Sequence, residues 1–372
     1  MANYPWTSVN RSAADSAGSS RTSEAPLAQT LAGRGPLLVL GAKGQLGRAL
    51  LQRLSKKPDP LKGRSAVVGL SRSELDLSDL LAVERALNEL QPAAVLNAAA
   101  YTAVDQAESE PAQAHRLNEE LPARLARYCA QQQIPLVHYS TDYVFSGQGE
   151  RAWQEDDPAS PLNVYGESKR LGEEAIEKEG GRYLIFRTSW VFDEEGKNFV
   201  NTMLRLGAER EELKVVSDQV GAPTYAGHLA ELSLKALQRG LAQEAFPSGI
   251  YHLSAQGHTT WFDFAQAIFA EGQKRGLRLK VQRLLPILSQ DYTTPAERPL
   301  NSRLDLNRFI STFALQPPHW EEGLRACLDR RMGSQDGAQA DSRAESHDQN
   351  RTLDRNKTLT QNQRNLTDKE KS

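Results

Sequence analysis

The sequence predicts an α/β fold, a doubly wound parallel sheet followed by a smaller C-terminal α/β lobe. Short runs of mainly apolar residues recur at 36–40, 66–70, 94–100 and 136–140, and the first of them is fully apolar. Such runs are typical of central parallel strands that are covered on both faces. Helical patterns lie between them, and strand-then-helix units in a row indicate a doubly wound sheet with ligands at the carboxyl ends of its strands.

Composition narrows the class of protein. The 372 residues carry a net charge of −2, which excludes the strongly basic field of a non-specific nucleic-acid binder. The two cysteines, Cys129 and Cys327, form no C-x-x-C pair and suit a reducing compartment. No run of about 18 apolar residues occurs, so no membrane-spanning helix is expected. We therefore expect a cytoplasmic protein without nucleic-acid or membrane partners.

Both ends of the chain differ from the middle. Residues 1–35 show no hydrophobic period, and residues 333–372 contain no Phe, Trp or Tyr. Such segments bury too little apolar area to offset the entropy cost of ordering them. We therefore expect a disordered extension at 1–35 and a disordered polar tail at 333–372.

A glycine-rich turn follows the first apolar run. Gly41, Gly44 and Gly47 form a G-x-x-G-x-x-G pattern that includes Gln45 and Leu46, and a helical pattern comes next. Glycines in this context let backbone N–H groups approach a pyrophosphate at the positive end of the helix. The pattern predicts an NAD(P)-binding Rossmann domain, which we assign to 36–190 with later segments returning to it. Residues 191–330 are then mainly a substrate-binding lobe.

The second apolar run ends at Ser71 and Arg72. An acid at this place holds the ribose of NAD, whereas an arginine pairs with the 2′-phosphate of NADP. We therefore expect NADPH, with NADH as the alternative. Asp76 and Leu77 follow after a short loop and are expected beside the adenosine.

The chemistry is expected from Tyr165 and Lys169, which are four residues apart and would share one face of a helix. A nearby ammonium favours the phenolate, so Tyr165 could exchange a proton near neutral pH. Reduction of a ketone needs such a donor, because the alkoxide that hydride addition forms must be protonated. Thr141 ends the run at 136–140 and could polarise the carbonyl oxygen through its hydroxyl.

Taken together, these segments resemble the extended short-chain dehydrogenases and, within them, the dTDP-4-dehydrorhamnose reductases. The resemblance covers residues 37 to about 330. The matching stretches are Asn97–Asp105, His138–Phe145, Ser160–Gly166, Phe186–Val191, Asp218–Thr224 and Arg298–Leu304.

The resemblance implies an NADPH-dependent oxidoreductase that reduces the 4-keto group of dTDP-4-dehydro-6-deoxy-L-mannose to give dTDP-L-rhamnose. It makes Tyr165 the proton donor and lets Lys169 orient the nicotinamide ribose. Thr141, Asp142 and Tyr143 would bind the sugar, and Trp190 would form a wall of its pocket. The cofactor residues that it implies are Gly44, Gln45, Leu46, Asp76, Leu77, Ala99, Ala100, Tyr101 and Thr102. The oligomeric state stays open between monomer and homodimer.

One position departs from the family pattern. Some members dimerise through Mg²⁺ held by glutamates, one of them on the helix after the glycine turn. Ala49 stands there in this chain and has no oxygen to offer a hard cation. We expect no metal at this place.

Two other functions compete. A nucleotide-sugar 4,6-dehydratase or 4-epimerase has the same fold, but a dehydratase usually carries an Asp-Glu pair after the threonine. Here Thr141 and Asp142 are followed by Tyr143. A non-catalytic regulatory subunit, like that of methionine adenosyltransferase, is the second rival. Against it, this chain keeps the threonine, tyrosine and lysine together.

Overall fold

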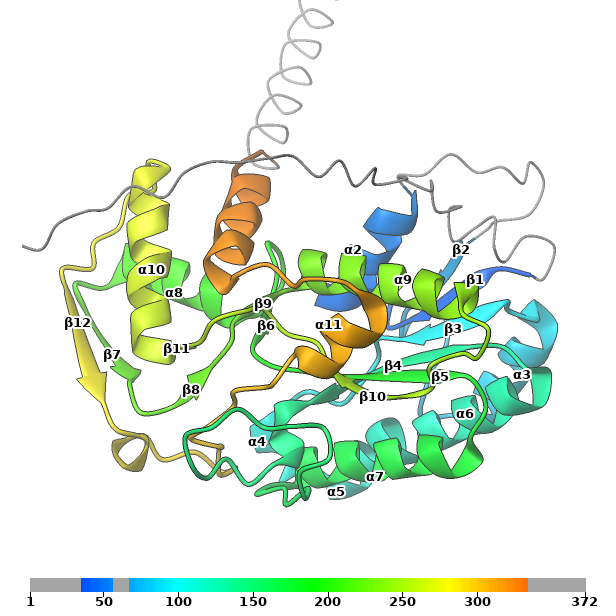
Figure 1. Ribbon diagram of the computed structural model, residues 1–372. Coiled ribbons are helices and arrows are strands. Elements are labelled where there is room, and N and C mark those ends of the chain that lie inside the picture. Colours follow the sequence, from blue (N-terminus) through cyan, green and yellow to red (C-terminus); the bar gives the residue numbers. More distant parts are fainter. Residues whose placement is uncertain (1–34, 56–66, 334–372) are drawn as a thin grey trace, which may run out of the picture.

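The computed structural model describes residues 35–55 and 67–333 (Figure 1). The tails expected at 1–35 and 333–372 lie outside this range, apart from residues 35 and 333. Within the described residues, no helix is long and apolar enough to cross a membrane.

The centre of the described structure is a six-stranded sheet in which every neighbouring pair is parallel. The order across the sheet is β2-β1-β3-β4-β5-β10. The strand order therefore reverses between β1 and β3. Ligands of such sheets bind at this switch point, outside the carboxyl ends of the strands. The strands are β1 (Leu37–Leu40), β2 (Val67–Leu70), β3 (Ala94–Asn97), β4 (Leu136–Thr141), β5 (Tyr183–Thr188) and β10 (Gly249–His252).

Alternation along β1 explains why a wholly apolar strand is needed. Leu37 and Val39 pack into the core on one face of the sheet, and Leu38 and Leu40 pack into the core on the other. The first face is covered by α2 (Gln45–Ser55), α9 (Ala226–Ala242) and α11 (Asn307–Phe313), and the second by α3 (Leu80–Leu90), α6 (Leu121–Gln132) and α7 (Val164–Glu179) (Figure 1). The predicted doubly wound parallel sheet is therefore confirmed.

A second hydrophobic core lies beside the sheet. It joins α8 (Phe199–Glu209), α10 (Trp261–Lys274), the parallel pair β7 (Glu212–Val216) and β12 (Arg283–Ile287), and the helix over 320–333. The short strands β6 (Val191–Phe192), β8 (Val220–Gly221), β9 (Thr224–Tyr225) and β11 (Thr259–Thr260) connect this core to the sheet. The remaining elements are α4 (Val104–Ala107), α5 (Pro111–His115), the π-helix η1 (Arg116–Glu120) and the 3₁₀ turns η2 (Asp142–Val144) and η3 (Ser289–Asp291).

One expected strand is shorter than its apolar run. The run at 94–100 forms β3 only as far as Asn97, and residues 98–103 continue without regular structure. Ala98 N–H donates to the backbone oxygen of Leu40 at 3.1 Å, and β3 then leaves the ladder. The small residues after Asn97 therefore cross the carboxyl end of the sheet as an open loop.

Candidate active site

One large cavity opens at the carboxyl ends of the strands. Its volume is about 920 Å³, and it is lined from β1, β2, β3, β4, β5, α7 and α10. Every residue expected to bind cofactor or substrate lines it except Gly47. These residues are Gly41, Gly44, Gln45, Leu46, Ser71, Arg72, Asp76, Leu77, Ala99, Ala100, Tyr101, Thr102, Thr141, Asp142, Tyr143, Tyr165, Lys169 and Trp190.

The glycine turn is shaped so that only glycine fits at two of its positions. Gly41 has φ +78°, and a Cβ there would lie 2.8 Å from the backbone nitrogen of Ala99. A Cβ on Gly47 would lie 2.1 Å from the backbone oxygen of Gly41, so Gly47 packs directly against the turn. The turn thus presents bare backbone at the N-terminus of α2, as a dinucleotide pyrophosphate requires.

The cavity continues to the end of β2, where cations replace the usual acid. Arg72 is exposed there and lines the cavity. Lys43 lines it too, and its Nζ donates to the Ser73 hydroxyl at 3.2 Å. Sequence reasoning missed Lys43, because it lies inside the glycine pattern. Asp76 accepts from the N–H and hydroxyl of Ser78, and these hydrogen bonds lower its pKa.

Tyr165 and Lys169 share one face of α7, as the spacing predicts. Asn163 caps this helix by accepting the Gly166 N–H at 2.8 Å, which starts the helix just before the pair. Lys169 does not bond the phenol. Its Nζ donates to the backbone oxygen of Tyr139 at 2.6 Å and lies 3.1 Å from Nε2 of His138.

The expected lowering of the Tyr165 pKa is not found. Burial raises the pKa of Tyr165 to about 12, with the Thr141 hydroxyl opposing the rise and the Asp142 charge adding to it. Removal from water costs the phenolate more than neighbouring groups return. A phenol with a raised pKa is protonated at neutral pH, which is the state that a proton donor must have.

Thr141 and Asp142 form a buried pair at the end of β4. The Thr141 hydroxyl donates to Oδ1 of Asp142 at 3.0 Å and accepts the Tyr143 N–H at 3.2 Å. Burial raises the pKa of Asp142 to about 6, although hydrogen bonds from Ser302 and Thr141 oppose the rise. The carboxylate is thus held in the cavity at a cost in stability.

Several buried polar atoms of residues that line the cavity have no hydrogen-bond partner within the described residues. Among them are Oδ2 of Asp142 and the hydroxyls of Ser140 and Thr188, near the ends of the adjacent strands β4 and β5. Because buried polar atoms in proteins are normally paired, such atoms indicate a polar ligand or water in the cavity.

Sequence reasoning also missed two residues of the cavity wall, Trp261 and Lys197, and one buried residue behind it, Asn118. Trp261 begins α10 and stacks on Trp190, with ring centroids 3.5 Å apart and an interplanar angle of 8°. Lys197 lines the same cavity from the loop before α8. Asn118 lies in the π-helix η1, where its side chain accepts the Tyr101 N–H at 2.8 Å and donates to the Ser168 hydroxyl at 3.0 Å. None of the three belongs to a local pattern that a single sequence reveals.

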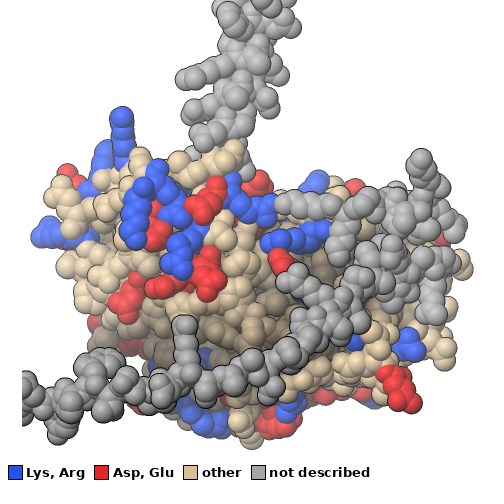
Figure 2. Space-filling model, turned by 45° about the horizontal axis from the view of Figure 1, so that its top comes forward, with Lys and Arg blue, Asp and Glu red and all other residues tan. Residues whose placement is uncertain are grey.

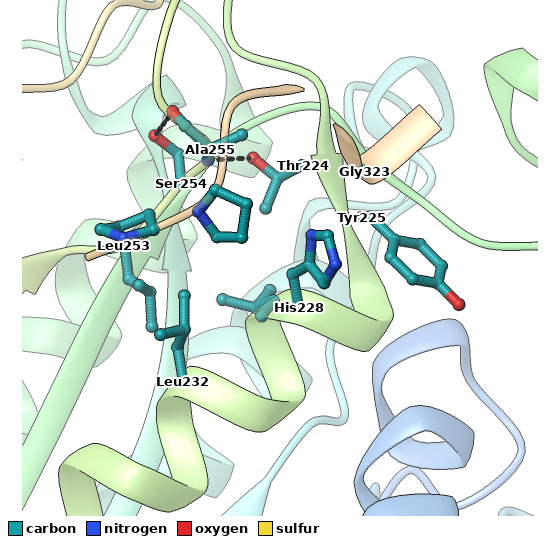
Figure 3. A pocket seen from close by; sticks show the side chains of 11 residues that line it. Thr224, Tyr225, His228, Leu232, Leu253, Ser254, Ala255 and Gly323 are labelled. Atoms are coloured by element: carbon teal, nitrogen blue, oxygen red, sulfur yellow. Dashed lines mark hydrogen bonds between the residues drawn. The ribbon is translucent and has the colours of Figure 1, made fainter. Parts of the chain in front are cut away.

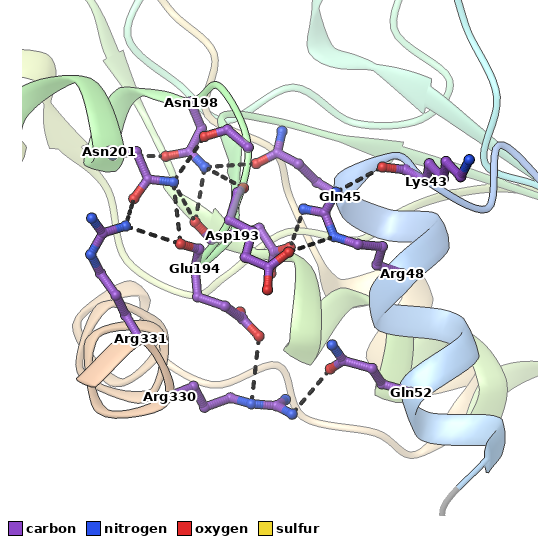
Figure 4. A network of polar contacts seen from close by, with 12 residues as sticks. Lys43, Gln45, Arg48, Gln52, Asp193, Glu194, Asn198, Asn201, Arg330 and Arg331 are labelled. Atoms are coloured by element: carbon purple, nitrogen blue, oxygen red, sulfur yellow. Dashed lines mark hydrogen bonds and ion pairs between the residues drawn. The ribbon is translucent and has the colours of Figure 1, made fainter. Parts of the chain in front are cut away.

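A polar network ties the glycine turn to the second core (Figure 4). Arg48 on α2 pairs with Asp193 at 3.1 Å and donates to the Lys43 backbone oxygen at 2.7 Å. Asn198 donates to the Gln45 side chain at 3.0 Å. Burial and the neighbouring Glu194 raise the pKa of Asp193, and Arg48 opposes that rise. The segment after β6 therefore fixes the position of the turn.

Other parts of the described structure give less support for a functional site. The hollow beside His228 in Figure 3 has a volume of about 10 Å³, room for roughly one water. Ala49 is buried, and the described residues contain no group of three or more His, Cys, Asp or Glu that could hold a metal ion. On the face shown in Figure 2, basic and acidic side chains are interspersed, so that face carries no field of a single sign.

Comparison with known proteins agrees with this geometry. Residues 35–332 match the family described as the RmlD substrate binding domain. The chain belongs to this family. Among its relatives, dTDP-4-dehydrorhamnose reductase of Shigella flexneri is 42% identical over 295 residues, which are 79% of this chain and 97% of that protein. The reductase of the same name from Burkholderia thailandensis is 43% identical over 297 residues, 78% of this chain and 97% of that protein.

Solved structures of the family show the same fold. The dTDP-4-dehydrorhamnose reductase of Bacillus anthracis, in complex with NADP, aligns with a TM-score of 0.71 at 33% identity and covers 80% of this chain and 99% of that chain. The Clostridium acetobutylicum protein aligns with the same TM-score at 34% identity, covering 79% of this chain and 98% of that chain. The family resemblance and the fold expected from the sequence are therefore confirmed.

Proposed function

We propose that this chain is an NADPH-dependent reductase that converts the 4-keto group of dTDP-4-dehydro-6-deoxy-L-mannose into the alcohol of dTDP-L-rhamnose. One observation carries the proposal. A glycine cradle for a dinucleotide and the set Thr141, Tyr165 and Lys169 face a single cavity, in a family whose relatives are named for this reaction.

The cavity residues suit the cofactor. The cradle at Gly41 and Gly47 leaves no room for a Cβ, so backbone N–H groups can meet the pyrophosphate. Lys43 and Arg72 line the same cavity, and their two cations would pair with the 2′-phosphate of NADPH. When bound, NADPH supplies the hydride.

The protein's own groups manage the proton and the developing charge. Tyr165 holds its proton at neutral pH and gives it to the oxygen that becomes negative as the carbonyl is reduced. The Thr141 hydroxyl stabilises the same oxygen by turning its single proton to it from Oδ1 of Asp142. Lys169, which is only 1% exposed, supports the proton donor Tyr165 from deeper in the cavity wall. The stacked tryptophans exclude water from one side of the cavity.

The domain assignment supports this division of labour. In this proposal residues 36–190 hold the cofactor, together with α9 and β10, which return to the sheet. The rest of 191–330 holds the nucleotide sugar. We further infer a cytoplasmic location, since both cysteines are free and buried. The oligomeric state stays open between monomer and homodimer.

Turnover of the named substrate tests the function. Purified protein with NADPH and dTDP-4-dehydro-6-deoxy-L-mannose should consume NADPH and form dTDP-L-rhamnose, identified against a standard by chromatography. Tyr165→Phe should lower kcat about a thousandfold while still binding NADPH. Tyr128→Phe removes a hydroxyl bonded to Leu87 away from the cavity and should leave kcat unchanged. No turnover by a wild-type protein that binds NADPH would reject the proposal.

A further inference from the structure

Two buried residues of the sheet meet the lysine of the active site and have no role in the function proposed above. His138 on β4 lies with Nε2 3.1 Å from Nζ of Lys169. Its other ring nitrogen, Nδ1, lies 3.1 Å from the side-chain nitrogen of Asn97 at the end of β3. All three side chains are 1% exposed. A continuous chain of polar atoms thus runs from β3 through the imidazole to Lys169.

The hydrogen positions along this row of three hydrogen-bonded side chains can be assigned. Burial and the neighbouring Lys169 hold the pKa of His138 well below its usual value, so the ring is neutral, with one N–H and one lone pair. The Asn97 oxygen accepts the Ala99 N–H at 3.3 Å, which turns the amide nitrogen toward Nδ1. Nδ1 is then the acceptor, and the ring proton lies on Nε2. It points at Nζ of Lys169.

This arrangement suits only one charge state of the lysine. An ammonium has three N–H donors and no lone pair, so it cannot accept from Nε2. A neutral amine can. For the ammonium, the ring proton must lie on Nδ1 and the Asn97 amide must turn by half a rotation, so that its oxygen accepts. That turn gives up only the Ala99 hydrogen bond, which at 3.3 Å is longer than the other contacts of this chain.

We propose that Asn97 and His138 are positioning residues for Lys169 and form a two-position hydrogen-bond switch, with the ring proton on Nε2 beside the amine and on Nδ1 beside the ammonium. The ring keeps one proton in both positions, and the proton that leaves Lys169 goes to water in the cavity. Both positions are accessible near neutral pH, because burial lowers the pKa of Lys169 to about 8. The consequence for catalysis rests on the proposed reductase function; the switch itself does not.

Other charged and titratable groups face this chain from the neighbouring elements. Glu173, one turn further along α7, raises the pKa of Lys169 and is itself held by Arg187 of β5 at 2.7 Å. Tyr165 lies one turn back on the helix, and Asp142 lines the cavity from η2. From β3 (Ala94–Asn97) comes no titratable side chain. The carboxylate of Glu173 favours the ammonium and so opposes the effect of burial on Lys169.

Asn97→Asp is the variant that separates the two positions. One carboxylate oxygen keeps the Ala99 N–H and the other accepts from Nδ1, so the ring proton is fixed on Nδ1 and Nε2 accepts from the ammonium. The measurement is nitrogen NMR of ¹⁵N-histidine in ligand-free protein, between about pH 6 and pH 10, where Lys169 titrates. The His138 signals are assigned by their loss in His138→Gln.

In the wild type, the ring proton should move from Nδ1 to Nε2 as the pH rises through the titration of Lys169. In Asn97→Asp it should stay on Nδ1, and the alkaline limb of kcat/KM should move up by about one pH unit. In Lys169→Met, which removes the titrating partner, the tautomer should not change with pH. If Asn97→Asp does not fold, the comparison of wild type with Lys169→Met still tests the switch.

Three outcomes would overturn the switch: one tautomer at all pH values in the wild type, a protonated ring near neutral pH, or an unmoved alkaline limb in Asn97→Asp. A new carboxylate also acts on Lys169 through space. In a His138→Leu background, therefore, Asn97→Asp should lose most of its shift, and a full shift there would also contradict the switch. The NMR needs no substrate, so absent turnover would reject the reductase function and leave the switch to be judged on its own.

Discussion

Trp190 and Trp261 stack face to face, with ring centroids 3.5 Å apart, and so join the end of the sheet to the first turn of α10. Trp190 adopts φ +48°, a conformation that bulky residues rarely take and that costs on the order of 1–3 kcal/mol. Gly221 packs against the same ring, since a Cβ there would lie 2.6 Å from it. Strain of this kind persists where the surroundings hold it, and here it aims an aromatic wall into the cavity.

Removal of the second ring should therefore weaken substrate binding. Trp261→Ala should raise KM for the nucleotide sugar about tenfold and leave the NADPH Kd within roughly twofold. Trp261→Phe keeps a ring and should retain most of the affinity. Trp320→Phe alters the second core away from the cavity and should leave KM unchanged. An equal rise of KM in the Trp320 variant would mean that packing of the lobe, and not the wall, sets the affinity.

A methyl group at Gly47 should weaken cofactor binding. The Cβ would lie 2.1 Å from the Gly41 oxygen, so α2 and the turn must move apart. Titration of NADPH fluorescence should show a Kd raised about tenfold or more in Gly47→Ala. Gly249→Ala is the matched control, because its Cβ meets only ordinary contacts, the nearest at 3.6 Å on the Tyr251 ring. Wild-type affinity in Gly47→Ala would contradict the cradle.

Asp142→Asn should make the protein more stable and less active. The folded-state pKa of Asp142 is raised from 3.8 to about 6, so its ionised form costs stability above that pH. Urea unfolding at about pH 8 should show a gain of up to about 3 kcal/mol. The gain should shrink as the pH falls through about 6 and vanish below about 4. Asp291→Asn, at an exposed position, should show no such dependence. A gain that does not change with pH would refute the assignment.

The Arg48–Asp193 pair should contribute to both stability and cofactor affinity. Arg48→Ala leaves a carboxylate of 5% exposure without its partner and should cost about 2 kcal/mol of the free energy of unfolding. It should also weaken NADPH binding severalfold, because the Lys43 carbonyl loses its donor. Arg85→Ala breaks an exposed pair at 4.0 Å and should cost less than about 0.5 kcal/mol. An equal loss of unfolding free energy in Arg48→Ala and Arg85→Ala would contradict a stabilising role of the network beyond that of a surface ion pair.

The sheet could be predicted because each strand corresponds to a short, contiguous run of mainly apolar residues. The run at 36–40 is apolar on both faces and became β1, and the run at 136–140 became β4. The spacing of Tyr165 and Lys169 correctly indicated one helical face. The prediction of a strand over 94–100 was wrong at its C-terminal end. Hydrophobic pattern cannot show that β3 leaves the ladder at Asn97, since small residues suit both a strand and an open loop.

The site could be predicted only where motifs are contiguous. Trp261 lies far along the chain from Trp190 and meets it through tertiary packing alone. The partner of Lys169 was also unpredictable. Helical spacing places the lysine beside Tyr165, but its Nζ turns inward to His138 and the Tyr139 carbonyl. Burial then decides the Tyr165 pKa, and burial is a property of the whole fold.

The central claim is reduction at C4 with a proton from Tyr165, and isotope transfer tests it most directly. With NADPH deuterated at the transferable position, the product dTDP-L-rhamnose should carry deuterium at C4, as located by NMR. Tyr165→Phe should bind the cofactor and transfer almost none. Product with no deuterium at C4, or transfer at the wild-type rate in Tyr165→Phe, would contradict the account.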